Sequence, residues 1–238
     1  MSNRNKPELF YENTVEGRFV RRLNRFTAEV EIDGVVQEVH VKNTGRLGEL
    51  LVPKAKVTLQ QIASETRATA YDLISVYKPR LKWVNVDSLA PNALMKQYYN
   101  DGTFALVKPE FTYGSSRFDF YMERGGEKYL SEVKGCTLAA PIPGFGLFPD
   151  APTERGVKHL YELAEAVANG YHCSIDFVIQ MNGIRQVNPN DETQPEFRQA
   201  LLHAVKAGVE VVCHGCHVEA DRIWISSIVG DTQRFKTR

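Results

Sequence analysis

Two carboxylates and a lysine in residues 113–135 are spaced so that they could act together on a substrate. The pair Gly125-Gly126 predicts a two-residue β-hairpin turn, because glycine readily adopts the positive φ angles of a type I′ turn and the flanking residues alternate in polarity. With the turn at this pair, facing residues have numbers that sum to 251. Because strand side chains alternate with period two, one face of the hairpin then carries four charged residues: Arg117, Asp119, Glu132 and Lys134.

Asp119 and Glu132 face each other in this register, and like charges directly opposite on neighbouring strands destabilise a sheet. One interpretation is a cross-strand charge cluster on a solvated face, neutralised by Lys134 and Arg117. The other is a site for Mg²⁺ or Mn²⁺, held by the two carboxylates together with water and phosphate oxygens. Glu110, near the end of the preceding strand, is either a further metal ligand or a solvent-exposed glutamate.

Longer segments around these residues resemble known proteins. Asp119 followed by Glu132-Val133-Lys134 is similar to the motif of the PD-(D/E)XK nuclease superfamily. The runs 117–120, 132–138 and 148–160 resemble the SfsA family, named for sugar fermentation stimulation, and the likeness extends to Asn43-Thr44-Gly45-Arg46. The resemblance implies an OB-fold β-barrel in residues 1–82 and a nuclease-like αβββαβ domain in residues 83–238.

The same resemblance implies DNA binding without sequence specificity, to double- or single-stranded DNA. Asp119, Glu132 and Lys134 would be the catalytic residues, with Lys134 polarising the attacking water or stabilising charge on the phosphate. The protein is then either a metal-dependent nuclease or a non-catalytic DNA-binding regulator that keeps the nuclease scaffold.

A run of arginines near the N-terminus predicts a nucleic-acid contact. Residues 17–25 read GRFVRRLNR, with no acidic residue and with apolar Phe19, Leu23 and Phe26 interleaved. Small β-barrels commonly hold nucleic acid through backbone charge and base stacking, although a solvated strand face is the ordinary alternative. The predicted DNA contacts from the barrel and the hairpin are Arg18, Arg21, Arg22, Arg25, Asn43, Arg46 and Arg117.

A predicted helix that begins near Asp150 or Thr153 carries Arg155, Lys158 and His159 in its first turns. Cations there oppose the helix dipole unless an anion is bound, which favours phosphate contact by all three. The alternative is local pairing, with His159 bound to Glu162. The long segment 136–149 just before this helix is predicted to be a mobile loop that covers the site.

The motif Cys213-x-x-Cys216-His217 matches the pattern of covalent haem attachment. We expect neither haem nor zinc here, because no second pair of zinc ligands follows at a suitable spacing. The segment is predicted to be a surface hairpin between strands at 209–213 and 222–226.

The composition is that of an ordinary globular protein, with 43% hydrophobic and 24% charged residues among 238 and a net charge of zero. Zero net charge argues against a histone-like binder. With no apolar run long enough for a membrane span and no export signal, the sequence predicts a cytoplasmic protein with no membrane partner. Oligomeric state is left open.

Overall fold

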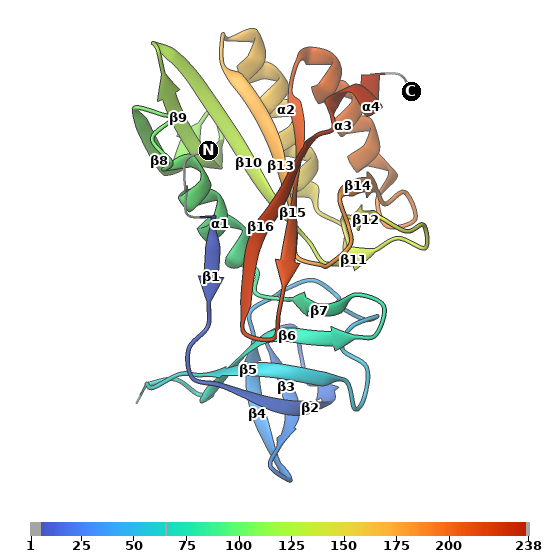
Figure 1. Cartoon of the computed structure of the whole chain (residues 1–238). Coiled ribbons are helices and arrows are strands. Elements are labelled where there is room, and N and C mark those ends of the chain that lie inside the picture. The colour runs from blue at the N-terminus through green and yellow to red at the C-terminus, as the bar shows by residue number, and fades with distance from the viewer. Residues whose placement is uncertain (1–5, 65, 237–238) are drawn as a thin grey trace.

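A computed structural model describes residues 6–64 and 66–236, which form two stacked domains (Figure 1). The lower domain is a closed barrel in the strand order β4-β3-β2-β5-β6, with the parallel pairing of β4 and β6 closing it and β7 added at the edge. The predicted OB barrel is thereby confirmed. Its strands are β2 (Thr14–Arg22), β3 (Thr27–Ile32), β4 (Val35–Val41), β5 (Lys56–Gln61), β6 (Tyr71–Lys78) and β7 (Lys82–Asn85).

Alternating apolar residues fill the barrel, as a half-buried strand pattern requires. Val30, Val39, Val57 and Leu59 are fully buried. The turn between β3 and β4 is made by Asp33 and Gly34, both at positive φ, as the sequence predicts.

The upper domain is built on one mixed seven-stranded sheet in the order β1-β16-β15-β13-β10-β9-β8. Only β10, β13 and β15 pair in parallel. The order α1, β8, β9, β10, α2, β13 follows the expected αβββαβ sequence, with β11 and β12 inserted before α2. The sheet strands are β1 (Glu8–Phe10), β8 (Leu106–Tyr113), β9 (Ser116–Arg124), β10 (Glu127–Cys136), β13 (His172–Ile179), β15 (Glu210–Val218) and β16 (Arg222–Gly230).

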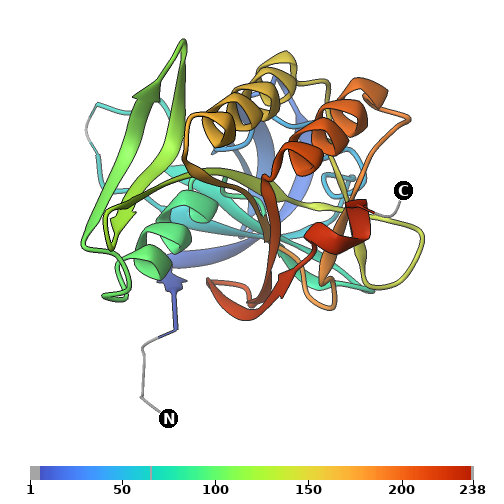
Figure 2. The ribbon, with the colours of Figure 1, turned by 90° about the horizontal axis from the view of Figure 1, so that it is seen from above.

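Helices cover both faces of this sheet (Figure 2). α1 (Ala90–Tyr99) lies on one face, and α2 (Glu154–Ala168) and α3 (Pro195–Ala207) lie side by side on the other, with the short α4 (Thr232–Lys236) against α3. Thr153 caps α2 by accepting a hydrogen bond from the Gly156 amide at 3.0 Å, in line with one of the two predicted caps. At the start of α3, Gln194 is the N-cap residue and makes no side-chain cap.

The segment 136–149 is not an irregular loop. It contains β11 (Leu138–Ala139) and β12 (Phe145–Phe148), which form a small sheet with β14 (Gln186–Pro189). The Phe148 ring packs edge-on against Phe177 and Phe197, at centroid distances of 5.6 and 5.1 Å. Phe148 is thus packed against the core, which does not favour the prediction that segment 136–149 is a mobile loop covering the site.

The Cys213-x-x-Cys216 motif lies inside β15, so the prediction of a surface hairpin is wrong. The two cysteines belong to different apolar cores, on opposite faces of the sheet. Burial raises the pKa of each thiol to about 12, which keeps both protonated at neutral pH. Because the two sulfur atoms lie on opposite faces of the sheet, they cannot bind one metal ion or one haem together.

The two domains are held together by strand pairing of the N-terminal segment and by side-chain hydrogen bonds. β1, from the N-terminal segment, pairs with β16 of the upper sheet. Gln180 of the upper domain donates from Nε2 to Asn85 Oδ1 at 2.8 Å and to the Asp87 carbonyl at 2.9 Å. No helix in the described ranges is long and apolar enough to cross a membrane.

Candidate metal and nucleic-acid site

The β9–β10 hairpin has the predicted register. Gly125 and Gly126 adopt φ angles of +60° and +85°, and the strand pairs run from Arg124 with Glu127 to Phe120 with Ser131. The ladder ends there, one pair before Asp119 and Glu132. On its other edge β10 pairs with β13 from Tyr129 to Cys136, and the Asp119 carboxylate accepts a hydrogen bond from the Val133 amide at 2.8 Å. The two acids therefore lie where the two strands separate.

Glu132 is buried at 3% exposure and is held through one oxygen only. Its Oε1 accepts hydrogen bonds from Lys134 Nζ and from His159 Nδ1, the latter at 2.5 Å. Its Oε2 is buried and has no partner among the described residues. Burial acts to raise the pKa of Glu132, but Lys134 and His159 outweigh it and hold that pKa below its ordinary value.

The pKa of Asp119 is shifted in the opposite direction to that of Glu132. Burial, and secondly the charge of Glu132, raise the pKa of Asp119 despite hydrogen bonds to its carboxylate. Asn92 of α1 donates one of these bonds, from Nδ2 to Oδ1 at 2.7 Å. The pKa values of the two acids therefore shift in opposite directions, because Glu132 has Lys134 and His159 as hydrogen-bond donors.

His159 is buried at 2% exposure, and its hydrogen bonds define its tautomer. Arg155 Nε lies 3.2 Å from His159 Nε2, and a guanidinium can only donate, so Nε2 accepts and Nδ1 carries the proton. His159 therefore donates to Glu132 from α2 and is not exposed to phosphate, which corrects both the predicted phosphate contact and the alternative partner Glu162. Glu162 instead accepts from Ser115 Oγ at 2.8 Å.

The other predicted members of this site lie farther out. Arg117 and Glu110 form an ion pair at 3.0 Å, and both side chains are more than half exposed. Glu110 is thus paired on the surface rather than brought to Glu132. Lys158 is half exposed, 3.7 Å from Glu162.

Arg22 is a structural residue of the barrel. Its five N–H donors each bond a backbone carbonyl, at 2.7–3.1 Å. It has no donor left for a phosphate, which corrects its predicted role. It also ties two loops together, since the five carbonyls belong to Asn24, Arg25, Asn43, Gly45 and Arg46.

Arg22 thereby brings the exposed Arg25 and Arg46 close to each other. Within the described ranges, Arg18, Arg25 and Arg46 form no ion pair, whereas Arg21 is bound by two hydrogen bonds to Glu29, at 2.8 and 2.9 Å. The Arg25 guanidinium lies 4.9 Å from the centre of the Phe26 ring. Among the predicted arginines of the barrel, these three are the ones that remain available to an external anion.

The loop at Asn43 meets the end of β10. Asn43 accepts from the Gly45 amide at 2.8 Å and donates to the Val86 carbonyl at 3.1 Å, so its amide serves the loop itself. Asn43, Gly135 and Asp150 line a small cavity of about 50 Å³. The basic loops of the barrel are therefore adjacent to the strand that carries Glu132 and Lys134.

The donor set fits a hard divalent cation. Mg²⁺ is commonly bound by one or two carboxylates, with water and substrate oxygens completing its shell. Asp119 and Glu132 supply such a pair, and the buried Glu132 Oε2 is an acceptor that has no protein partner. Among residues 6–64 and 66–236, no group of three or more His, Cys, Asp or Glu side chains is placed to hold a metal.

Sequence reasoning did not find the two residues that position the acids. Asn92 lies on a helix remote in sequence from Asp119, and no local pattern marks it. His159 was singled out for the wrong contact, because its partner is on a strand rather than on its own helix.

Comparison with known proteins identifies the family. Residues 20–86 match the model described as SfsA N-terminal OB domain, and residues 87–222 match that of the sugar fermentation stimulation protein RE domain. A sugar fermentation stimulation protein homolog of Desulfitobacterium hafniense is 48% identical over 216 residues, covering 90% of this chain and 93% of that protein. A homolog from Ruminiclostridium cellulolyticum is 44% identical over 223 residues, covering 92% of this chain and 97% of that protein.

A solved structure has the same fold. It is described as the structure of Pyrococcus furiosus SfsA in complex with Ca²⁺, and it matches with a TM-score of 0.83 at 23% identity, covering 93% of this chain and 97% of that one. The barrel, the mixed sheet with its helices and these matches along nearly the whole chain lead to one conclusion: the protein belongs to the SfsA family.

Proposed function

We propose that the protein binds DNA without sequence specificity and hydrolyses phosphodiester bonds at a divalent-metal site formed by Asp119 and Glu132. The observation that carries this proposal is the buried Glu132 carboxylate, with Lys134 and His159 on Oε1 and nothing on Oε2. An unpartnered carboxylate oxygen beside a second acid is costly to bury unless a cation binds there.

Each neighbouring residue has a defined task in this proposal. Bound Mg²⁺ or Mn²⁺ would supply Lewis-acid activation of water and of the phosphate. His159 and Arg155 orient Glu132, while Asn92 and the Val133 amide orient Asp119. Lys134, already placed beside Glu132, can stabilise negative charge as it develops on the phosphate. The Ca²⁺ described for the P. furiosus protein is a cation of the same hard, oxygen-binding class.

The barrel supports the DNA-binding part of the proposal. Arg25 and Arg46 are exposed and held close together by Arg22, next to Phe26, which is 47% exposed. A cationic pair beside an exposed ring can contact a phosphate and stack on a base. Because the loop of Arg46 also borders the end of β10, one nucleic acid could contact the barrel and the acid pair together.

A cleavage assay tests the enzymatic part. Purified protein is incubated with single- and double-stranded DNA, with Mg²⁺ or Mn²⁺ and with EDTA. Glu132→Gln and Lys134→Ala should each lower metal-dependent cleavage by at least about 100-fold, the usual cost of losing one key electrostatic group. Glu165→Gln, an exposed acid on α2, is the matched control. Wild-type protein that binds DNA but never cuts it would favour the non-catalytic regulator.

A salt titration tests the binding part separately. Each lost phosphate contact lowers the slope of log affinity against log salt by roughly 0.7–0.9. The double variant Arg25→Ala/Arg46→Ala should therefore lose about two contacts, whereas Arg21→Ala should change little because Glu29 already holds that guanidinium. An unchanged slope in the double variant would remove this pair from the interface.

A further inference from the structure

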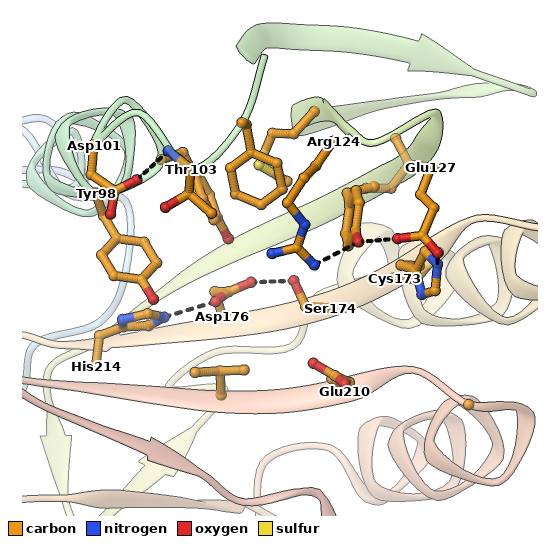
Figure 3. A pocket seen from close by; sticks show the side chains of 18 residues that line it. Tyr98, Asp101, Thr103, Arg124, Glu127, Cys173, Ser174, Asp176, Glu210 and His214 are labelled. Atoms are coloured by element: carbon orange, nitrogen blue, oxygen red, sulfur yellow. Dashed lines mark hydrogen bonds and ion pairs between the residues drawn. The ribbon is translucent and has the colours of Figure 1, made fainter. Parts of the chain in front are cut away.

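A second cavity, of about 470 Å³, lies at the end of the β9–β10 hairpin, beside the C-terminal end of α1 (Figure 3). Its volume is within the range of small-molecule sites. The aromatic side chains Tyr98, Phe104 and Tyr129 contribute to its walls. It is separate from the acid pair, because neither Asp119 nor Glu132 lines it.

The cavity is lined in part by a second buried carboxylate–histidine pair, Asp176 and His214, with 2.7 Å between Oδ1 and Nε2. Ser131 and Ser174 both donate to Asp176 Oδ2. Each carboxylate oxygen of Asp176 is thus occupied, and Tyr99 completes the network by donating to Ser131 at 3.0 Å. Nothing in the proposed hydrolysis uses this network.

His214 has one ring nitrogen left over. The ionised Asp176 carboxylate can only accept, so His214 Nε2 carries the proton. In the neutral ring, Nδ1 is then an acceptor, and it is buried with no partner among the described residues, on a side chain that is 1% exposed. An unmade hydrogen bond of this kind costs about 1–3 kcal/mol.

The charged side chains that line the cavity are four carboxylates and one guanidinium, so the excess charge is negative. Arg124 is already engaged, since it lies 5.5 and 5.0 Å from the ring centres of Phe104 and Tyr129 and donates to Tyr129 Oη at 2.7 Å. In the described part of the chain, Glu210 has no hydrogen bond or ion pair. Figure 3 shows Glu210 and Arg124 on opposite sides of the cavity.

We propose that this cavity binds a small organic cation, an amine whose ammonium group donates to Glu210 and whose carbon body packs against Tyr98 and Phe104. Aromatic walls attract cations, and an acidic cavity raises their local concentration. An organic cation suits this cavity because aromatic rings form much of its wall, and a ring attracts an ammonium group. The rings of Phe104 and Tyr129 already hold one cation, the Arg124 guanidinium.

Calorimetric titration of the full-length chain at about 0.15 M salt tests the proposal, with tyramine as the probe and 4-ethylphenol as its neutral counterpart. Tyramine should bind with a stoichiometry of one, and 4-ethylphenol should bind at least about tenfold more weakly, as expected for loss of a charge-assisted hydrogen bond. Equal affinities for the two compounds, or no saturable binding of tyramine, would overturn the proposal.

Two variants locate the binding without disturbing the buried pair. Glu210→Gln, on the exposed rim, should weaken tyramine binding at least about tenfold, while Glu165→Gln on α2 should leave it unchanged. Nitrogen NMR of the histidine rings gives a second readout, because a ligand that fills the cavity should shift the ring resonances of His214, which lines it, and leave those of His159 in place. Unchanged affinity in Glu210→Gln, or a silent His214 resonance, would place the amine elsewhere on the surface.

Discussion

The same sheet holds two buried carboxylate–histidine pairs that differ in which atom is left without a partner. In the pair Glu132–His159, the histidine has both ring nitrogens occupied, by Glu132 and Arg155, and the carboxylate keeps a free Oε2. In the pair Asp176–His214, the carboxylate is fully occupied and the histidine keeps a free Nδ1.

This difference determines which ligand each pair can take. A free carboxylate oxygen beside a second acid attracts a metal ion, whereas a free nitrogen of a neutral imidazole ring carries no charge and can accept a hydrogen bond. Both pairs would look alike in a list of buried charged residues. The two pairs can be distinguished only when each lone pair and each proton is assigned to a hydrogen-bond partner.

The largest expected difference between the pairs is in stability. Asp176→Ala leaves His214, Ser131 and Ser174 without their common acceptor inside the protein, and breaking a buried pair of this kind costs about 3–5 kcal/mol. Glu132→Ala should cost less, about 1–3 kcal/mol, because Lys134 is 17% exposed and can reach water. Removing the Glu132 carboxylate also ends its repulsion with Asp119. Urea unfolding in EDTA measures both, and equal losses would contradict the distinction.

Added metal should stabilise the Glu132 site by a smaller amount. A ligand that binds only the folded protein stabilises it by about 2.7 kcal/mol at 100 times its Kd. Mg²⁺ or Mn²⁺ should therefore raise the melting temperature of wild-type protein, and Asp119→Asn or Glu132→Gln should abolish most of this gain. Lys134→Ala should keep it, because an ammonium group is not a metal ligand. A thermal melt that is indifferent to both metals would rule out the metal site.

The sequence predicts the features of the Glu132 site that depend on local residues. The Gly125-Gly126 turn determines the hairpin register, and register alone brings Asp119 and Glu132 to the same place. It does not determine where the ladder stops, because the last pair is Phe120 with Ser131 and no local pattern in the sequence marks that position.

The second pair and the role of Arg22 depend on contacts between distant segments. Asp176 lies in an otherwise apolar run, and a buried acid in such a run needs a partner, which was a signal that could have been used. His214 falls inside the cysteine motif of residues 213–217, and that motif gives no sign of its contact with Asp176. Arg22 follows a bulge in β2 between Phe19 and Arg21, so strict alternation of strand side chains could not place it.

The last prediction concerns Asp119, whose pKa is raised where that of its neighbour Glu132 is lowered. A carboxyl group with a raised folded-state pKa adds stability below its unfolded pKa and loses that contribution as the pH rises through the folded pKa. For Glu132 the sign is reversed, so its contribution is present above the unfolded pKa and is lost as the pH falls through the folded pKa.

In EDTA at neutral pH, Asp119→Asn should therefore be more stable than wild type, by roughly 0.5–2 kcal/mol, the usual size of a stabilising substitution. The new amide oxygen can still accept from the Val133 amide, and a flip of the Asn92 amide lets its oxygen accept from the new NH₂ group. Glu132→Gln, the matched control, should lose stability at the same pH, because Lys134 and His159 favour the charged form of Glu132.

Urea unfolding curves in EDTA at neutral pH and at about pH 3 measure both effects. The advantage of Asp119→Asn should disappear at the lower pH, where the wild-type carboxyl group is itself protonated. An advantage that persists at low pH would come from packing rather than charge. Loss of stability in both variants at neutral pH would mean that the two acids do not oppose each other, and the electrostatic reason for a cation between them would be gone.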